Sequence, residues 1–502
     1  MGPSASHAFH QRVWYVALVV HVITAWFSSG FYAADEHYQV IAFAQVKLGE
    51  LNSADLPWEF EARMRSAFLP GIACAVIGTC RKLITADPFI ITFLLRLITA
   101  WSALVVVRAF VRAALAQVSD QLQRPFILLS YFLWFLPYQH VRFAAETWSG
   151  LLFLLGLSVL LGSSVRNRSW LIAGVCFGMC LQLKPSMIVA CGGAVCWALL
   201  NSETQGRSLA RLVCGGVIAL ALGAVVDSWF YNEPIHTFWN YLYKNSLSIS
   251  KVHPLPVASE TYPWWYYFPW IMKYGIWPIG AVLLGSLLWL TYRAPRSLVV
   301  WCIWPYLLLV SAIPHKELRF LFPLVDLAPL MLVLGWQEVG NGKFVDVLKH
   351  RAVLIPIVAI NTLGLLVTCT TAAGSGRTRL AEALWENKTL QAGSLGYDFD
   401  DNQIWRARIP SFYLPTPTRD IGMHHPCAHS LERIANDAPD LLIAVEPDHA
   451  SGSCLPDSIG YEVIRAGEPD WTRVPMLIYN ADRPRRSMLY ARKDRISHPS
   501  EP

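Results

Sequence analysis

The chain has 502 residues, of which 54% are hydrophobic and only 15% are charged. An ordinary soluble protein carries about 25% charged residues, so this composition excludes that class. The net charge of +6 comes without a basic stripe interleaved with aromatic residues, which argues against nucleic-acid binding. The apolar residues form runs of roughly 17–25, long enough to cross about 30 Å of hydrocarbon. The sequence therefore predicts a polytopic, all-α membrane protein.

The apolar runs give the expected transmembrane helices in chain order. The first run, Val13 to Phe31, lacks a clear small-residue cleavage site, so we expect a retained span rather than a removed signal peptide. The other candidate spans lie at roughly 88–107, 125–138, 145–163, 169–183, 186–200, 209–229, 264–292, 297–314, 320–337 and 352–373. Together they predict about eleven transmembrane helices.

Basic residues in the short loops indicate the orientation. With a cytoplasmic N-terminus, every predicted cytoplasmic loop is basic, as the positive-inside rule requires. The residues concerned are Arg108, Arg112, Arg124, Arg166, Arg168, Arg207, Arg211, Arg293, Arg296, Lys343, Lys349 and Arg351. Residues 66–86 are also apolar, but a span there would invert all later loops. We expect them to form a juxtamembrane or re-entrant helix against the outer face.

These assignments divide the chain into a membrane domain, 1–373, with a first outer loop at 32–87, and an outer domain, 374–502. The outer domain is rich in charge and proline, and short runs such as "LLIAVEP" and "PMLIYNA" favour a small α+β or β-rich fold. It holds two cysteines, Cys427 and Cys454, which we expect to form a disulfide in an oxidising compartment. Closing the loop of about 26 residues would contribute roughly 3–4 kcal/mol. Two unrelated thiols are the alternative, and non-reducing peptide mapping distinguishes them.

Polar clusters gather in the loops predicted on the outer face. They are Asp35 with Glu36, 57–66, 140–147, 182–186, 227–245 and 314–320. Cations on that face, namely Arg142, Lys184, Lys316 and Arg319, run against the positive-inside trend. Acids and bases at one membrane surface indicate a site for an anionic, lipid-borne group.

A polyprenyl-phosphate sugar fits such a site chemically. Its phosphate departs as a stabilised anion, so no general acid is needed, whereas a base that takes the proton of an acceptor hydroxyl is useful. Cations that stabilise the charge developing on the phosphate supply a large part of the rate. One outward-facing carboxylate with a set of Lys, Arg and His side chains is the minimal arrangement.

Four motifs resemble those of the glycosyltransferase family 22 mannosyltransferases, membrane enzymes of the GT-C fold. They are "ADEHYQ" (34–39), "WEFEARMRS" (58–66), "DSWFYNEP…NYLYKN" (227–245) and "HKELRFLFP" (315–323). The last is the most specific, and the set is most similar to the GPI mannosyltransferases. The resemblance covers roughly residues 13–340. It departs at Ala34 and Asn232, where the family has Pro and Gly, and in the contracted spacing of Arg142 and Glu146.

The resemblance implies roles for individual residues. Asp35 would be the base, and Glu36 would position the acceptor hydroxyls. The residues expected at the donor phosphate are His315, Lys316, Arg319, Arg142 and Lys184. Those expected at the acceptor or sugar are Trp58, Glu59, Glu146, Asp227 and Trp264. No cofactor or metal is expected, because the lipid-phosphate sugar is itself a substrate.

The implied reaction is an inverting transfer of mannose from a polyprenyl- or dolichyl-phosphate donor to a hydroxyl of a lipid-linked glycan, which gives an α-mannoside. The acceptor would be a GPI precursor or a lipid-linked oligosaccharide. The active site would face the outer side of the endoplasmic reticulum membrane in a eukaryote, or of the inner membrane in a bacterium. A GT-C transferase that uses another polyprenyl-phosphate sugar is the main alternative.

Each of these residues also has a structural interpretation. Arg142 and Glu146 could be a helical ion pair, Lys184 an anchor whose charge reaches the interface, and Trp264 part of an interfacial aromatic belt. Glu59 could cap a helix, Asp227 could be structural, and residues 315–319 could form a plain basic loop.

Two further motifs and two further protein classes are weaker alternatives. Asp398 and Asp400 have the D-x-D spacing of metal-dependent nucleotide-sugar transferases, but they fall in the outer domain. "HHPCAH" (424–429) could ligate zinc, but no second ligand cluster accompanies it. A transporter is disfavoured because the polar clusters lie at one face and the two halves of the chain do not resemble each other. A scaffold would not need a base and a cation set.

Overall fold

The structure is a computed structural model, and it describes residues 3–162, 167–201, 205–246, 261–339, 351–391, 393–398, 408–423, 439–445, 460–475 and 486–496. The chain forms two compact units. The first, here called the bundle unit, comprises Met1–Ala25, Tyr38–Lys82 and Leu94–Cys369. The second, the tail unit, comprises Trp26–His37, Leu83–Phe93 and Thr370–Pro502.

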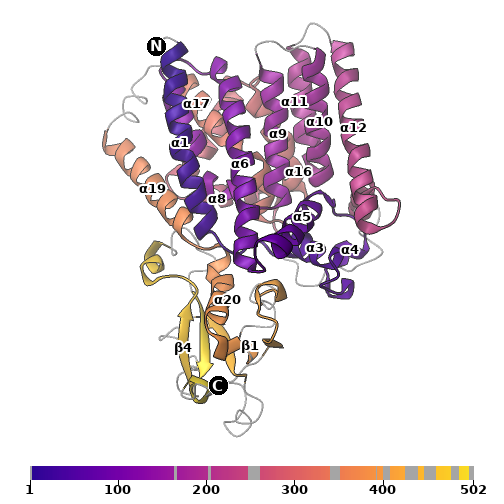
Figure 1. The fold of residues 1–502 in the computed structure, drawn as a ribbon. Coiled ribbons are helices and arrows are strands. Elements are labelled where there is room, and N and C mark those ends of the chain that lie inside the picture. Colours follow the sequence, from indigo (N-terminus) through magenta and orange to yellow (C-terminus); the bar gives the residue numbers. More distant parts are fainter. Residues whose placement is uncertain are drawn as a thin grey trace. The chain divides into compact units, whose positions relative to one another are not determined.

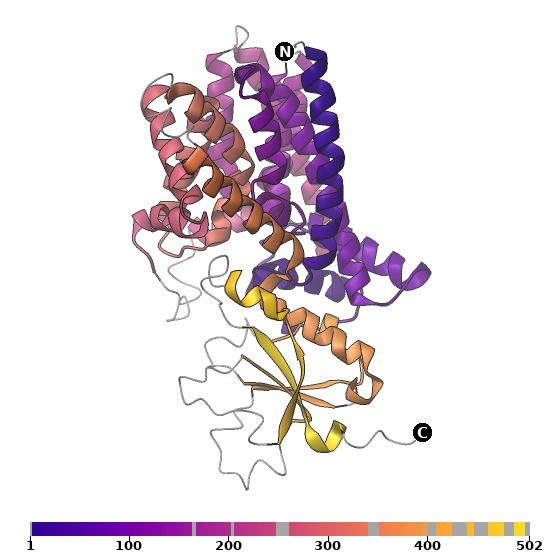
Figure 2. The same ribbon diagram turned by 90° about the vertical axis from the view of Figure 1, so that its left-hand side faces the viewer.

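The bundle unit is built from helices, several of which run side by side (Figures 1 and 2). The first half of the chain contributes α1 (Pro3–Phe27), α3 (Ala42–Lys47), α4 (Trp58–Glu61), α5 (Phe68–Leu83), α6 (Pro88–Ala114), α7 (Gln123–Phe132), α8 (Leu136–His140), α9 (Ala145–Leu161), α10 (Asn167–Leu183), α11 (Ile188–Leu200) and α12 (Gln205–Tyr231). The second half contributes α13 (Thr237–Ser246), α14 (Tyr267–Tyr274), α15 (Ile279–Arg293), α16 (Leu298–Ala312), the 3₁₀ helix η6 (Leu318–Leu327), α17 (Ala328–Val339) and α19 (Arg351–Thr370).

By length and composition, four described helices could cross a membrane, and a fifth span arises if the bent pair α15 and α16 is counted as one. The four are Pro88–Gln117, Gly206–Tyr231, Leu318–Val339 and Arg351–Thr370. Shorter apolar helices occupy Ala145–Leu161, Arg168–Leu183 and Pro185–Leu200. A mostly helical protein with several apolar helices is thus confirmed. The count of eleven spans, the orientation and the position of α5 at the membrane surface stay predictions.

Glycines bring α10 and α12 into backbone contact. A Cβ atom added to Gly174 would overlap the Leu212 carbonyl, and one added to Gly215 would overlap the Leu171 carbonyl. Gly178 likewise lies against Gly216. In a membrane, small residues of this kind let helix backbones approach closely enough for van der Waals attraction to hold them. We call this contact the glycine seam.

The tail unit contains a five-stranded mixed sheet in the order β2-β1-β3-β5-β4. The strands are β1 (Ser394–Asp398), β2 (Arg419–Met423), β3 (Leu441–Val445), β4 (Tyr461–Ala466) and β5 (Ser487–Arg492). Strand β1 is parallel to both β2 and β3, whereas β5 is antiparallel to β3 and β4. Helices α20 (Arg377–Glu386), which packs on β4 and β5, and α21 (Lys388–Gln391) precede the sheet.

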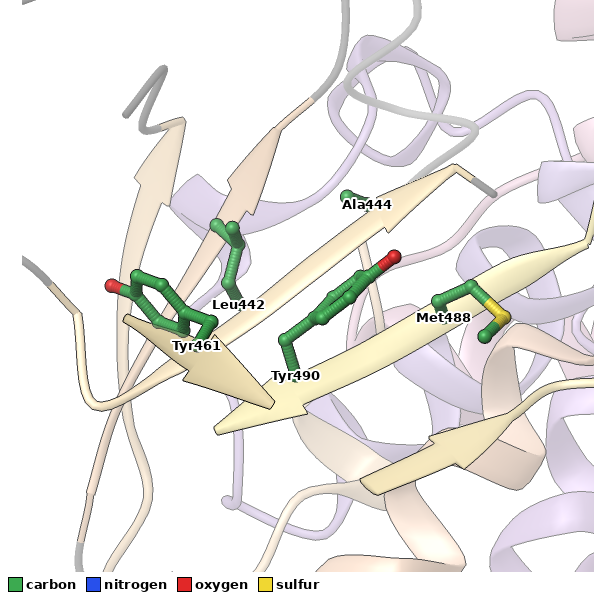
Figure 3. Packing of buried hydrophobic residues seen from close by; sticks show 5 residues of the cluster. All are labelled: Leu442, Ala444, Tyr461, Met488 and Tyr490. Carbon is green, nitrogen blue, oxygen red and sulfur yellow. The ribbon is translucent and has the colours of Figure 1, made fainter. Parts of the chain in front are cut away.

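Alternate residues of neighbouring strands supply the core of one sheet face, because successive side chains in a strand point to opposite faces. Figure 3 shows this cluster, which consists of Leu442, Ala444, Tyr461, Met488 and Tyr490. The expected small α+β domain at the C-terminal end is therefore present. The run "LLIAVEP" supplies β3, whereas most of "PMLIYNA" lies outside the described residues.

A buried carboxyl group, Glu468, sits between β4 and β5 in sequence. Its Oε1 atom accepts the Ala372 amide at 2.7 Å, and its Oε2 atom lies 3.7 Å from Arg379 Nη1. Burial raises the pKa of Glu468 to about 7, although Arg379 and the Ala372 amide act in the opposite direction. In the folded protein, Glu468 therefore stays protonated at pH values well above 4.5, the ordinary pKa of a glutamate side chain.

This pKa predicts a pH dependence of stability. Between about pH 4.5 and about 7 the folded state holds a proton that the unfolded state has lost, so the contribution of Glu468 to stability falls as the pH rises through this window. Glu468→Gln mimics the neutral form and removes that term. The unfolding temperature of wild type should therefore decline relative to that of the variant across the window, measured in the same detergent. A difference that does not change with pH would contradict the prediction.

Candidate active site

Four charged residues from three parts of the bundle unit form one ion-pair cluster. Lys184, after α10, donates to Glu146 Oε1, near the start of α9, at 2.6 Å. Arg319, in η6, lies 3.9 Å from the same oxygen through Nη1. The Arg319 Nε and Nη2 atoms donate to the two carboxylate oxygens of Glu317 at 2.6 and 2.8 Å. We call these four residues the cation cluster.

Glu317 holds Arg319 in a fixed orientation, because a bidentate carboxylate fixes the plane of the guanidinium. The His315 Nε2 atom approaches the Glu317 Oε1 atom at 3.0 Å. Burial acts to raise the pKa of Glu317, but the hydrogen bonds and charges of His315 and Arg319 outweigh it and hold the pKa far below its usual range. Glu317 is therefore ionised at every physiological pH.

The two cations of the cluster are almost out of water. Their side chains are 11% exposed for Lys184 and 12% for Arg319. The centre of the Phe320 ring lies 5.1 Å from Lys184 Nζ and 5.7 Å from the Arg319 guanidinium. A charge in such surroundings is weakly screened, so the interactions of these cations with neighbouring charges, Glu146 and Glu317 included, are stronger than those of an exposed lysine or arginine.

The other cations expected at a phosphate have different surroundings. Lys316 is buried, and its Nζ atom donates to the carbonyls of Ser311 and Ile313 at 2.8 and 2.6 Å. It thus caps the C-terminal end of α16, a position where a cation is favourable. Arg142 is also buried, with its guanidinium 4.9 Å from the centre of the Tyr138 ring.

Arg142 and Glu146 do not lie on one helix, as the interpretation of a helical ion pair requires. Arg142 lies in the link between α8 and α9, whereas Glu146 lies on α9 and pairs with Lys184.

A buried chain of polar side chains ties α1, α8 and η6 together. His21 Nδ1 donates to the Ala17 carbonyl at 2.7 Å, so the Nε2 atom of a neutral His21 accepts from His140 Nδ1 at 3.0 Å. His140 Nε2 in turn lies 2.7 Å from Asp326 Oδ1. His140 immediately precedes the link that carries Arg142, and Asp326 lies on the same 3₁₀ helix as Arg319. These hydrogen bonds therefore hold η6, which carries Arg319, and the link that leads into α9, which carries Glu146.

The acid pair belongs to the residue range of the tail unit. Asp35 and Glu36 form the short helix α2 (Ala34–Glu36), and both side chains are half-buried. Glu36 Oε1 accepts the backbone amides of Tyr32 and Ala33 at 3.2 and 3.3 Å. Glu36 therefore stabilises the turn next to Asp35. The sequence had not suggested this role for Glu36.

The residues expected at the acceptor differ widely in exposure. Trp58 is 46% exposed and Trp264 is 64% exposed, as an interfacial or a sugar-stacking ring would be. Glu59, on α4, accepts hydrogen bonds from Gln39 and Arg65 at 3.3 and 3.5 Å.

Asp227, near the end of α12, is fully buried. Its Oδ1 atom accepts the Ala67 amide at 2.8 Å, and its Oδ2 atom accepts from Gln182 and Thr237 at 2.5 Å each. Both oxygens are thus used inside the protein. Asp227 joins the segment before α5 to α10, α12 and α13, which favours the structural interpretation over contact with a sugar.

This arrangement predicts the effect of Asp227→Asn. The amide nitrogen would face a donor, either the Ala67 amide or the Gln182 and Thr237 side chains, and one buried donor would lose its acceptor. Such a loss costs about 1–3 kcal/mol, and we expect a lower unfolding temperature of the purified protein. Glu233→Gln, at an exposed acid nearby, is the control. An unchanged unfolding temperature in Asp227→Asn would contradict this role.

Several residues of the site could not be assigned from sequence. Glu317 lies inside the recognised motif "HKELRFLFP", and Gln182 inside the polar cluster 182–186, but nothing in either segment indicates their partners. Asp398 ends β1 and is half-buried, whereas Asp400, "HHPCAH", Cys427 and Cys454 lie outside the described residues. Within the described ranges, no group of three or more His, Cys, Asp and Glu side chains could hold a metal ion.

Comparisons with known proteins identify the family of this chain. The profile of the Alg9-like mannosyltransferase family matches residues 12–382. GPI mannosyltransferase 3 of Candida albicans is 23% identical over 342 residues, which cover 67% of this chain and 64% of that protein. GPI mannosyltransferase 3 of Drosophila melanogaster is 26% identical over 339 residues, 63% of this chain and 54% of that protein. The chain thus spans less than two thirds of the length of either relative.

The fold has a counterpart among solved structures. The crystal structure of ArnT from Cupriavidus metallidurans in the apo state superposes with a TM-score of 0.51 at 14% identity, covering 98% of this chain and 99% of that chain. This likeness confirms a fold of the GT-C type. With the family match over nearly three quarters of its length, the chain belongs to the Alg9-like mannosyltransferase family.

Proposed function

We propose that this protein transfers mannose from a polyprenyl- or dolichyl-phosphate donor to a hydroxyl group of a lipid-linked glycan, a GPI precursor or a related glycolipid. The transfer inverts the configuration at the anomeric carbon and leaves an α-mannoside. The reaction takes place at the extracytoplasmic face of the membrane. Family membership and the names of the similar proteins support the sugar and the class of acceptor.

The observation that carries this proposal is the cation cluster. Lys184 and Arg319 are held together from distant parts of the chain, beside Glu146, in surroundings nearly free of water. An ordinary surface loop would leave both cations solvated. Burying two cations is costly unless they are paired or serve an anion. Here Glu146 holds Lys184, and Glu317 holds Arg319.

In the proposed reaction, the acceptor hydroxyl oxygen attacks the anomeric carbon of mannose. The bond between that carbon and the phosphate oxygen breaks, and its electron pair stays on the phosphate. Asp35 takes the proton of the attacking hydroxyl, and Lys184 with Arg319 stabilises the new negative charge on the phosphate. The leaving phosphate needs no proton, so one base and one cation set suffice.

The carboxylates beside the cations have a defined part in this scheme. Glu317 fixes the guanidinium plane of Arg319, and Glu146 fixes the Lys184 ammonium. Cations that are already in place do not reorganise as the charge develops, and preorganisation of this kind is the main source of electrostatic catalysis.

A transfer assay tests the proposal. The full-length protein in lipid nanodiscs would receive a mannosylated glycolipid acceptor and, in parallel reactions, polyprenyl-phosphate mannose, polyprenyl-phosphate glucose or GDP-mannose. We expect a product heavier by one hexose with the first donor only, and we expect an α-mannosidase to remove that hexose. Transfer from polyprenyl-phosphate glucose instead would replace mannose as the substrate, and transfer from GDP-mannose would refute a lipid-linked donor.

A further inference from the structure

The tail unit includes the segment that carries the acid pair. Residues Trp26–His37 cluster with Thr370–Pro502 rather than with the helices that follow them in the chain. One hydrogen bond between the two stretches joins residues 352 positions apart in sequence. The sequence gives no sign of this association.

Backbone and arginine contacts anchor the N-terminal side of this segment. The Ala373 amide donates to the Ser29 carbonyl at 2.8 Å, and Arg379 Nη2 donates to the Phe27 carbonyl at 2.8 Å. Phe27 ends α1, so its carbonyl has no partner within the helix. It accepts the Ser29 amide at 2.9 Å, and Arg379 is a second donor to it. The guanidinium of Arg379 also lies 5.8 Å from the centre of the Phe27 ring.

Glycine allows the two stretches to meet at close range. Gly30 has a φ of +87°, and a Cβ atom there would lie 2.6 Å from Thr378 Oγ1 and 3.1 Å from the Ala373 carbonyl oxygen. Gly374 has a φ of +64°, and a Cβ atom there would lie 2.7 Å from the Phe31 carbonyl oxygen. Both positions thus need a residue without a side chain, on conformational and on steric grounds.

Aromatic rings anchor the other side of the acid pair. His37, directly after Glu36, is buried, and its ring centre lies 5.7 Å from that of Tyr413 and 6.1 Å from that of Phe412. Burial lowers the pKa of His37 to about 3, so the ring packs as a neutral aromatic group. Asp35 and Glu36 therefore lie between two anchors, both supplied by the tail unit.

Glu468 connects these anchors to the sheet. It holds the Ala372 amide through one oxygen and lies beside Arg379 through the other. Its own backbone carbonyl accepts from Arg486 at 2.9 Å, and Arg486 directly precedes β5. Through Glu468, the Ala372–Arg379 stretch is thus held to the sheet.

We infer that the tail unit serves as the positioning platform for the acid pair, with Arg379 and Glu468 as positioning residues that act on Asp35 through the backbone of residues 27–37. The inference rests on the proposed function only in taking Asp35 as the base. The anchoring itself is independent of the reaction. A base that shifts by about 1 Å can lose about 10²-fold in rate, so such a platform has a catalytic consequence.

The first test measures the anchoring without any transfer assay. Amide hydrogen exchange of residues 27–37 is followed in full-length wild type, in Arg379→Ala and in Arg465→Ala. Arg465 is the matched control, because it is another arginine of the tail unit that pairs with acids. Its partners, Glu386 at 2.9 Å and Glu382 at 3.8 Å, lie on α20. We expect exchange to rise about 10-fold or more in Arg379→Ala only. Equal exchange in all three proteins would overturn the inference.

The second test measures the consequence for transfer. We expect kcat to fall about 10²-fold in Arg379→Ala, with KM for the donor unchanged, and to recover largely in Arg379→Lys, which keeps a donor and a charge. Arg465→Ala should match wild type. Faster exchange with an unchanged kcat would overturn the positioning role while leaving the proposed function intact. An active Asp35→Asn would instead refute the base on which both rest.

A third measurement covers the case in which Arg379→Ala fails to fold. In Ser29→Cys with Ala373→Cys, the two residues already joined by a backbone hydrogen bond should form a disulfide on mild oxidation, detected by peptide mapping, with transfer retained. Failure to form the disulfide in a folded protein would overturn the association of the two stretches.

Discussion

Replacing Asp35 by asparagine should reduce mannose transfer by about 10²–10⁴-fold, the usual cost of losing a general base. Asparagine keeps the size of the side chain and its capacity to hydrogen-bond, but it cannot take the proton of the acceptor hydroxyl. Glu36, which closes the adjoining turn through the amides of Tyr32 and Ala33, is left unchanged. The measurement is the initial rate of transfer at saturating donor and acceptor, with the protein quantified in the membrane.

Asp55→Asn provides the control for this experiment. Asp55 is an exposed acid of the same first loop, so its replacement removes an equal charge without touching α2. We expect wild-type rates there. Transfer by Asp35→Asn within a few-fold of wild type would exclude Asp35 as the base.

The cation cluster should give the second large effect. Arg319→Ala removes the guanidinium that Glu317 orients, and Lys184→Ala removes the ammonium that Glu146 holds. Loss of one group that stabilises developing charge costs about 10²–10³-fold in kcat, so we expect a fall of this size in each variant. Initial rates at varied donor and acceptor concentrations measure it, and the loss should be seen in donor use more than in acceptor binding.

The double variant, Lys184→Ala with Arg319→Ala, tests whether the two cations act on the same phosphate group. If both cations act on one phosphate, removing the second costs less after the first has gone, so the two free-energy changes will not add. Arg293→Ala, at an exposed arginine of α15, controls for the loss of a positive charge. Small and strictly additive effects of the two cluster variants would exclude the cation cluster as the site of the donor phosphate.

Hydropathy predicted most helices of the bundle, because crossing hydrocarbon demands long apolar runs. The run 145–163 corresponds to Ala145–Leu161, and 209–229 lies within Gln205–Tyr231. The run 264–292 was expected as one span but is divided into α14 and α15. Gly275 and Pro278 lie at that division, and both are helix-breaking signals that hydropathy averages over.

The site was predictable only as far as local motifs reach. Glu317 and Arg319 lie within one recognised motif, but the motif does not indicate that they pair. The pairing of Glu146 with Lys184 depends on how α9 packs beside α10, which one sequence does not reveal. Two neighbouring cations bind different partners: Lys316 donates to carbonyls of α16, and Arg319 donates to Glu317. This difference depends on the 3₁₀ turn that begins at Leu318.

The glycine seam between α10 and α12 has a consequence for how the protein withstands extraction from the membrane. Its strength comes from van der Waals contact between backbones, and lipid tails and detergent tails compete with such contact equally poorly. Val217 and Val225 are exposed on α12. Detergent can replace lipid around such side chains without disturbing the glycine seam. Helices α10 and α12 should therefore leave the bilayer as a pair, with Asp227 still bound to Gln182.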